Sequence, residues 1–194
     1  MLKNATQTRI NVAQVHKFGG SSLASAARFS AVADIIQQQD PQHQLWVVVS
    51  APGDTTDALL HIIACADDTA ARDQALASLQ QQLNQLVAET LTAAAATTVQ
   101  TQLQRWLADV PQALAQQRVN DVLAIGERLS ALLLSEVLKQ RNLNAAALDA
   151  RESAVGERLG ATRGQVTPPA GGEQAGGDRR IRAQVEVVQG DAGD

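Results

Sequence analysis

Two short apolar segments, each followed by a turn of small residues and then by a helical pattern, constrain the fold of this chain most. Residues 10–17 are rich in Val and Ile, and residues 44–50 contain the continuous apolar run Leu45–Val49. A run that is apolar at every position is typical of a strand covered on both faces, as in a parallel sheet. Parallel strands joined by helices make an α/β domain. We therefore expect a mostly parallel sheet with helices on both faces.

The remaining patterns up to residue 151 are mainly helical. Apolar residues recur three or four apart in several segments, which predicts a helix in each. These segments are residues 22–39, 55–65, 76–91, 98–109 and 120–141. Pro111 is expected to break or restart the helix beside it, because proline has no backbone N–H to donate. Residues 145–149 are short and apolar and are expected to form a third strand.

The charge and cysteine content exclude several classes of protein. Sixteen basic and twenty acidic residues give a net charge of −4, whereas nucleic-acid binding needs a basic surface. Cys65 is the single cysteine, which fits a reducing cytoplasm and excludes a disulfide within one chain. No apolar stretch approaches the ~20 residues that span a bilayer, and the first 15 residues lack the apolar run of a signal peptide. We expect a soluble, cytoplasmic protein with no nucleic-acid or membrane partner.

The composition changes at about residue 152. The chain has 13 glycines, of which only four precede this point, and residues 152–194 contain one leucine and no Phe or Trp. Such a segment buries too little apolar surface to offset the entropy lost on ordering. We expect a disordered tail, used for interaction or read past a frameshift, in which only 179–188 could form a short strand. The expected organisation is a flexible leader (1–9), a folded part (10–151) and this tail.

The strongest chemical signal is residues 17–22, Lys-Phe-Gly-Gly-Ser-Ser, where the first strand should end and a helix begin. The adjacent Gly19 and Gly20 would let backbone amides approach a phosphate closely. Lys17 would neutralise charge on a transferring phosphoryl group, and Ser21 would donate to its oxygens. The alternative is an ordinary strand-to-helix turn with an exposed lysine. No Gly-x4-Gly-Lys-Ser/Thr motif exists, so a P-loop of that type is not expected.

The second signal is the turn at residues 50–57, which follows the second strand. Open α/β sheets bind ligands beyond the carboxyl ends of their strands, so this turn and residues 17–22 should face one crevice. Ser50 and Thr56 would then offer hydroxyl groups to a substrate. The alternative is that Thr55 or Thr56 only caps the helix that follows.

The third signal is Gly126-Glu127, within the helix expected over residues 120–141. A glycine in a helix interior is about 1 kcal/mol less favourable than alanine, which suggests that Gly126 permits the close approach of another segment. Glu127 lies beside the apolar stripe, where its carboxylate could receive the ammonium group of a substrate. The alternative is a solvated Glu127 beside a solvated Arg128.

Taken together, the three segments resemble those of the aspartokinases. Residues 15–23 match the family's amino-terminal signature, and the Val-Val-Ser…Thr-Thr and Gly-Glu-x-x-Ser-Ala segments follow in the family's order. Residues 148–151 resemble the end of the family's next strand. The likeness covers residues 10–151 and is greatest to the amino-terminal kinase part of bifunctional aspartokinase–homoserine dehydrogenases of the methionine-branch type. Phe18 and the serine pair fit aspartokinases better than kinases that act on glutamate derivatives.

The resemblance implies the amino-acid kinase fold and phosphorylation of the side-chain carboxylate of L-aspartate by ATP with Mg2+. This is the first step toward lysine, threonine and methionine. Lys17 would be the catalytic cation, and Thr56 and Glu127 would bind aspartate, with Glu127 at its ammonium group. The phosphates would be contacted by Lys17, Gly19, Gly20, Ser21 and Ser50. The metal would arrive with ATP, and no protein-bound metal is expected.

The sequence also departs from the aspartokinase pattern. The family's later aspartate-binding segment, nucleotide-binding strands and regulatory domains are not recognisable, and no Gly-x-Gly-x-x-Gly fingerprint of a dehydrogenase occurs. We therefore expect the amino-terminal half of an aspartate kinase without its nucleotide-binding half; the full-length family member would be a homo-oligomer. The alternatives are a non-catalytic remnant and an interaction protein that keeps the motifs.

Overall fold

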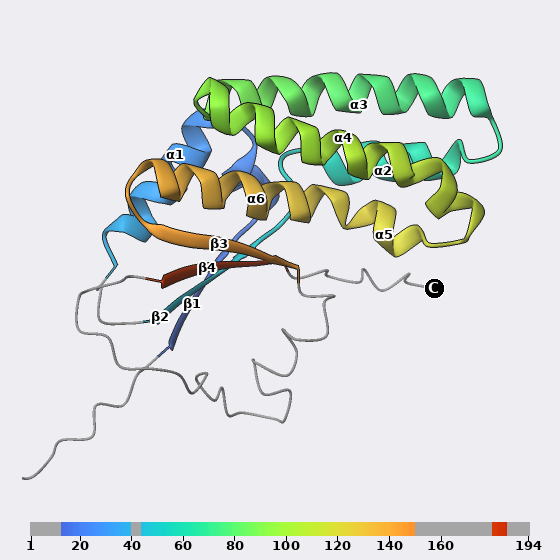
Figure 1. Ribbon diagram of the computed structural model, residues 1–194. Coiled ribbons are helices and arrows are strands. Elements are labelled where there is room, and N and C mark those ends of the chain that lie inside the picture. The colour runs from blue at the N-terminus through green and yellow to red at the C-terminus, as the bar shows by residue number, and fades with distance from the viewer. Residues whose placement is uncertain (1–12, 40–43, 150–179, 186–194) are drawn as a thin grey trace, which may run out of the picture.

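The computed structural model describes residues 13–39, 44–149 and 180–185, which form an α/β domain (Figure 1). One parallel sheet has the order β1-β2-β4-β3. Its strands are β1 (Ala13–Phe18), β2 (Gln44–Val49), β3 (Asn144–Asp149) and β4 (Arg180–Val185). A 3-10 turn, η1 (Gly20–Leu23), precedes the α-helices. These are α1 (Ala26–Gln37), α2 (Thr55–Ala64), α3 (Thr69–Thr90), α4 (Ala93–Ala115), α5 (Val119–Leu123) and α6 (Ile125–Gln140). The predicted parallel α/β fold is confirmed.

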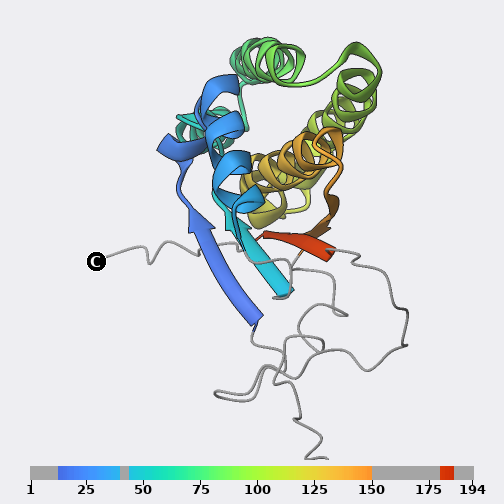
Figure 2. The same cartoon turned by 90° about the vertical axis from the view of Figure 1, so that its left-hand side faces the viewer.

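The described helices cover a single face of the sheet, with α3 farthest from the strands (Figures 1 and 2). The connections from β1 to β2 and from β2 to β3 step across the sheet in the same direction. Right-handed crossovers that step in one direction place their helices on the same face. Helices on both faces were expected, and within the described residues only one face carries them. On β1, Val15 and Lys17 are exposed and alternate with residues that lie toward the core.

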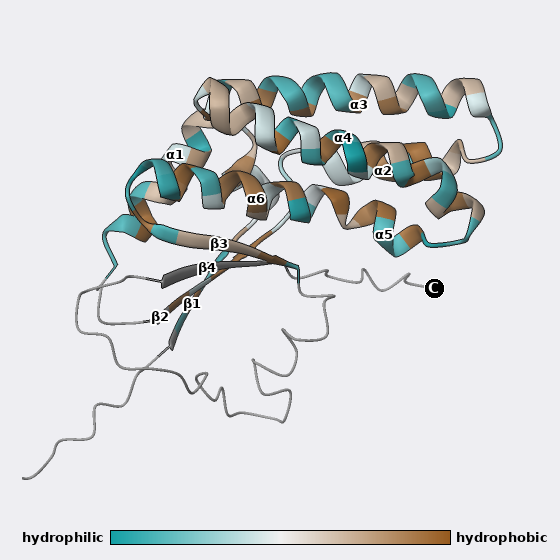
Figure 3. Cartoon of the chain, viewed as in Figure 1, coloured by the Kyte–Doolittle hydropathy of each residue, from teal (hydrophilic) through white to brown (hydrophobic). Residues whose placement is uncertain are grey.

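The core lies between this face of the sheet and the helices, and it is built mainly from aliphatic side chains. Of the buried residues of β2, Leu45, Val47 and Val49 belong to one cluster with α1, α3, α4 and α6. Hydropathy alternates along the helices, as amphipathic packing requires (Figure 3). The cluster holds the first turn of α6 against the sheet, which positions the site described below. In the described part of the chain, no helix combines the length and apolar character needed to cross a membrane.

Two helices differ from the sequence-based expectation. The prediction that Pro111 breaks or restarts a helix is wrong, because α4 continues through it to Ala115. Loss of one backbone hydrogen bond is offset there by the buried apolar face of α4, which includes Leu107 and Val110. The single helix expected over residues 120–141 is instead two helices, interrupted at Ala124. This interruption sets the direction in which the first turn of α6 approaches the sheet.

The segment expected to be a tail supplies one strand of the sheet. Strand β4 lies between β2 and β3 and pairs in parallel with both. Residues 179–188 were the one stretch of the tail where a short strand was considered possible, and β4 lies within it. Residues 180–185 therefore belong to the sheet, which corrects the expectation of disorder for this stretch. The leader and the other residues of the expected tail lie outside the described residues, so those domain limits stay predictions.

Candidate active site

The turns that follow β1 and β2 lie side by side, as the sequence predicts. The backbone N–H of Ser50 donates to the Phe18 carbonyl oxygen at 3.1 Å, and that of Gly53 donates to Gly20 at 3.1 Å. A Cβ atom on Gly20 would lie only 2.6 Å from the Ala51 carbonyl oxygen. Glycine is therefore required at position 20 for the two turns to touch. The contact brings the amides of both turns to the carboxyl-terminal edge of the sheet.

Gly19 differs from its neighbour, because the fold does not require glycine there. Its backbone is extended, with φ −77° and ψ 169°, a conformation open to other residues. A Cβ atom at this position would have nothing within 4 Å. The side-chain-free surface of Gly19 therefore faces open space, where a ligand can approach the backbone.

The start of α6 reaches the second turn through Gly126. A Cβ atom on Gly126 would lie 2.5 Å from the Cβ of Ala51 and 3.1 Å from the Cγ2 of Thr55. The prediction that this glycine permits a close approach is confirmed. The contact places the next residue, Glu127, against the turn that follows β2.

The Glu127 carboxylate is the unusual group of the site. Its Oε2 atom is buried and has no hydrogen-bond partner among the described residues. Burial raises the pKa of this carboxyl group, and backbone hydrogen bonds at Glu127 and Ala51 oppose that rise. A buried carboxylate oxygen without a donor is unfavourable by several kcal/mol. A ligand that brings a positively charged donor would remove this penalty.

The hydroxyl groups near the second turn have different environments. Thr55 is buried, and its hydroxyl donates to the Pro52 carbonyl oxygen at 2.5 Å, so it stabilises the turn. Asp54 is the N-cap of α2 and makes no side-chain capping bond. Thr56 is exposed in the first turn of that helix, and Ser50 is partly buried. Neither threonine is the N-cap of α2, and Thr56 is accessible to a ligand.

Lys17 lies one residue before the end of β1, opposite Val48 of β2, and is exposed. Ser21 is exposed in the 3-10 turn. The turn contacts thus join Gly19, Gly20 and Ser50 closely, and Gly126 adds Glu127 to them. Lys17, Ser21 and Thr56 border the same edge without a hydrogen bond or ion pair to these residues.

Comparison with known proteins gives the family. The amino acid kinase family model matches residues 13–185, a range that includes β4. This chain belongs to the amino acid kinase family.

Among curated relatives, this amino acid kinase is similar to aspartokinases. It is 35% identical over 153 residues to bifunctional aspartokinase/homoserine dehydrogenase 2 of Escherichia coli (strain K12), covering 75% of this chain and 18% of that protein. It is 29% identical over 142 residues to the aspartokinase of Chlamydia pneumoniae, covering 71% of this chain and 30% of that protein. The chain thus spans less than a third of the length of either relative.

Solved aspartokinases share its fold. E. coli aspartokinase III in complex with lysine and aspartate superimposes with a TM-score of 0.64 at 20% identity, covering 88% of this chain and 40% of that one. The same enzyme in complex with aspartate and ADP gives a TM-score of 0.59 at 18% identity, covering 89% and 40%. At these identities the likeness shows the fold alone.

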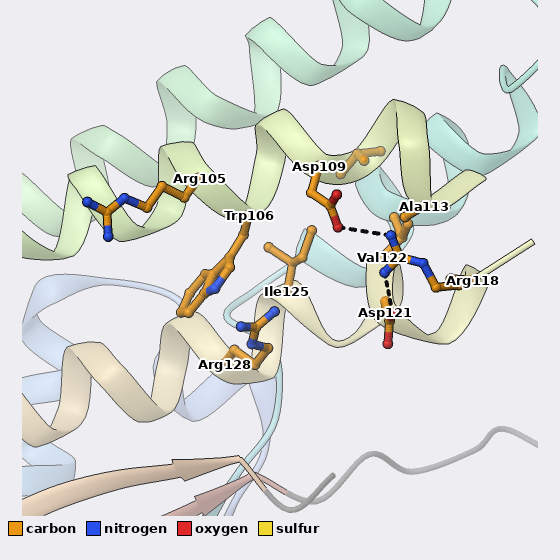
Figure 4. Close-up of a pocket in the computed structure, with 10 residues that line it drawn as sticks. Arg105, Trp106, Asp109, Ala113, Arg118, Asp121, Val122, Ile125 and Arg128 are labelled. Atoms are coloured by element: carbon orange, nitrogen blue, oxygen red, sulfur yellow. Dashed lines mark hydrogen bonds and ion pairs between the residues drawn. The ribbon is translucent and has the colours of Figure 1, made fainter. Parts of the chain in front are cut away.

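The structure of this amino acid kinase also shows functional candidates that the sequence analysis missed. Arg128 lies beside Asp149 at the end of β3, with its Nε 3.3 Å from the Asp149 Oδ2. Its guanidinium carbon lies 4.1 Å from the centre of the Trp106 ring on α4 (Figure 4). The alternative of a solvated Glu127 beside a solvated Arg128 does not hold, because both residues are half-buried. No local pattern joins residues 106, 128 and 149, so only the packing of α4, α6 and β3 reveals this group.

The described residues contain no group of three or more His, Cys, Asp or Glu side chains that could hold a metal ion. The groups at the two turns and the start of α6 include backbone amides, hydroxyls, the Lys17 ammonium group and the Glu127 carboxylate. Such a set can hold an anion at the two turns and a cation at Glu127.

Proposed function

We propose that the described residues form the aspartate-binding and phosphate-binding part of an aspartate kinase. Such an enzyme transfers the γ-phosphoryl group of MgATP to the side-chain carboxylate of L-aspartate. The observation that carries the proposal is the buried Oε2 of Glu127, which lies against the turn after β2 and has no hydrogen-bond partner in the described part of the chain. The names of the similar curated proteins, which are aspartokinases, support the choice of amino acid.

The ammonium group of L-aspartate would be the partner of Glu127. An ammonium group carries three donors and a full positive charge, so it can satisfy the open Oε2 and stabilise the ionised carboxylate. Thr56, exposed in the first turn of α2, would bind the same molecule through its hydroxyl group. The substrate side-chain carboxylate would then point toward the turn after β1.

The phosphates would lie at the two touching turns. Gly19 leaves its backbone open to a ligand, and the Ser21 amide and the hydroxyls of Ser21 and Ser50 border the same edge. Lys17 is the cation of this edge and would neutralise charge on the transferring phosphoryl group. Mg2+ would enter as part of the substrate MgATP.

No protein nucleophile is needed in this reaction. An oxygen of the aspartate side chain attacks the γ-phosphorus, and the bond to ADP breaks. The chain would accelerate the step by holding the two reactants in line and by offsetting their negative charge. Glu127 would therefore position the substrate, and Lys17 would neutralise charge on the phosphoryl group.

The chain matches 40% of the length of the solved aspartokinase III that it resembles. The test of the proposal is therefore binding of L-aspartate to the full chain, rather than turnover. Isothermal titration calorimetry should show binding by wild type and a loss of about tenfold or more in Glu127→Gln. Glu136→Gln is the matched control, since Glu136 lies on the same helix and pairs with Lys139 at 2.6 Å. Equal affinities of wild type and Glu127→Gln would refute the assignment.

A further inference from the structure

Arg128 directly follows Glu127 on α6, and among the described residues its guanidinium group contacts two other elements. Asp149 of β3 pairs with its Nε at 3.3 Å. The Trp106 ring of α4, drawn beside Arg128 in Figure 4, lies 4.1 Å from its Cζ. The side chains of Arg128 and Asp149 are only 25% and 15% exposed. Water and salt therefore screen this pair less than a pair on the open surface.

A free arginine at position 128 would have another partner within reach. On α3, Arg72 pairs with the acidic residue that directly follows it, Asp73, at 2.9 Å. Adjacent residues on a helix of this protein can therefore form an ion pair. Arg128 also lines two hollows, of about 180 Å³ and about 330 Å³, which leave room for its side chain to change rotamer.

We infer that Asp149 and Trp106 are positioning residues that hold Arg128 away from Glu127 and so keep the Glu127 carboxylate open for a ligand cation. The identity of that cation, the ammonium group of L-aspartate, rests on the proposed function. The role of the two positioning residues does not depend on it. They act through Arg128 and do not touch the substrate themselves.

Several charged groups near α6 have partners among the described residues. Arg118 binds the carboxylates of both Asp109 and Asp121, from α4 and α5 (Figure 4). Farther along the helix Glu136 pairs with Lys139, and Arg141 pairs with Asp34 of α1. β2 carries no titratable side chain. Among the described cations, Arg128 is the one next to Glu127 in the chain, whereas Lys17 and Arg105 lie on other elements.

The test is Asp149→Asn in the full chain, with the pKa of Glu127 followed by 13C NMR of its carboxyl carbon. The signal is assigned by its disappearance in Glu127→Gln. Release of Arg128 should lower the pKa of Glu127 by about one unit, because a paired cation favours the ionised carboxylate. Nuclear Overhauser contacts between Arg128 and the Trp106 ring should weaken at the same time. Affinity for L-aspartate should fall about tenfold, since Arg128 then occupies its place.

The double variant Arg128→Met/Asp149→Asn is the rescue control. Without the cation, the pKa of Glu127 should stay raised as in wild type, and affinity should return to within about threefold. If the ion pair had only a structural role, Asp149→Asn and the double variant would both lose affinity for L-aspartate to the same degree. Trp106→Leu frees Arg128 by a second route and decides the matter if Asp149→Asn does not fold.

Two results would overturn the inference. One is an unchanged Glu127 titration in folded Asp149→Asn, with the Arg128–Trp106 contacts retained. If Asp149→Asn does not fold, an unchanged Glu127 titration in Trp106→Leu has the same meaning. The other is a drop in the pKa of Glu127 that persists in the double variant. Failure of wild type to bind L-aspartate would refute the proposed function, and the titrations would still decide the role of Asp149 and Trp106.

Discussion

Gly126→Ala tests whether the close contact between α6 and the turn after β2 is required. The added Cβ would lie 2.5 Å from the Ala51 Cβ, 3.1 Å from the Thr55 Cγ2 and 3.3 Å from the Ala51 Cα. Carbon atoms prefer separations of about 3.5–4.0 Å, so the two segments must part by about 1 Å. Ala51 cannot yield easily, because it is buried and the preceding Ser50 is hydrogen-bonded to β1.

Two effects of opposite sign determine the result of Gly126→Ala. Overpacking of this kind is unfavourable by about 1–3 kcal/mol. The advantage of about 1 kcal/mol that alanine has over glycine applies to a helix interior, and it is smaller at Gly126, which lies in the first turn of α6. We expect a net fall of about 1–2 kcal/mol in the free energy of unfolding, measured by urea titration and far-UV circular dichroism. The displaced Glu127 should also lose affinity for L-aspartate.

Ala51→Gly supplies the matched test of the same contact. It removes the atom that the new Cβ would meet, so Ala51→Gly/Gly126→Ala should be more stable than the sum of the single changes predicts. A Gly126→Ala variant as stable as wild type, or more stable, would refute the reasoning. Additive effects in the double variant would also contradict it.

Three further predictions concern other residues of the site. Gly20→Ala should destabilise the fold by about 1–3 kcal/mol, because its Cβ would meet the Ala51 carbonyl oxygen at 2.6 Å. Gly19→Ala should leave urea unfolding nearly unchanged and weaken binding of ATP. A larger loss of stability in Gly19→Ala than in Gly20→Ala would contradict the geometry. Thr55→Val should lower the free energy of unfolding by about 1 kcal/mol, since the Pro52 carbonyl oxygen loses its hydroxyl donor and keeps only the Thr55 backbone N–H; an unchanged value would show that the bond is not needed. Glu127→Gln should be more stable than wild type at pH 7. Burial raises the pKa of the Glu127 carboxyl group in the folded state, so its ionisation lowers the free energy of unfolding as the pH rises through that pKa. The gain should vanish below the ordinary glutamate pKa of about 4.3, and a gain that is independent of pH would argue against a buried charge.

Much of the site could be predicted because its parts are local in sequence. Each turn directly follows an apolar strand, and the parallel arrangement of β1 and β2 makes their carboxyl ends neighbours. Gly126 was informative because glycine is unfavourable inside a helix, and the structure shows the close contact that explains it.

Other features depend on packing and could not be predicted locally. The continuation of α4 through Pro111 reflects the apolar face that the helix buries on either side of it. The position of β4 between β2 and β3 depends on pairing with strands far away in the chain. The placement of Arg128 likewise requires α4 and β3, which bring Trp106 and Asp149 to it.

The measurement that tests the central claim most directly is the pKa of Glu127 with and without L-aspartate, read from the 13C signal of its carboxyl group in the full chain. If Glu127 receives the substrate ammonium group, L-aspartate should lower the pKa, because the ammonium partner favours the ionised carboxylate. Succinate, which has the same two carboxylates and no ammonium group, should not lower it. A Glu127 pKa that is unchanged by saturating L-aspartate, or lowered equally by succinate, would contradict the account.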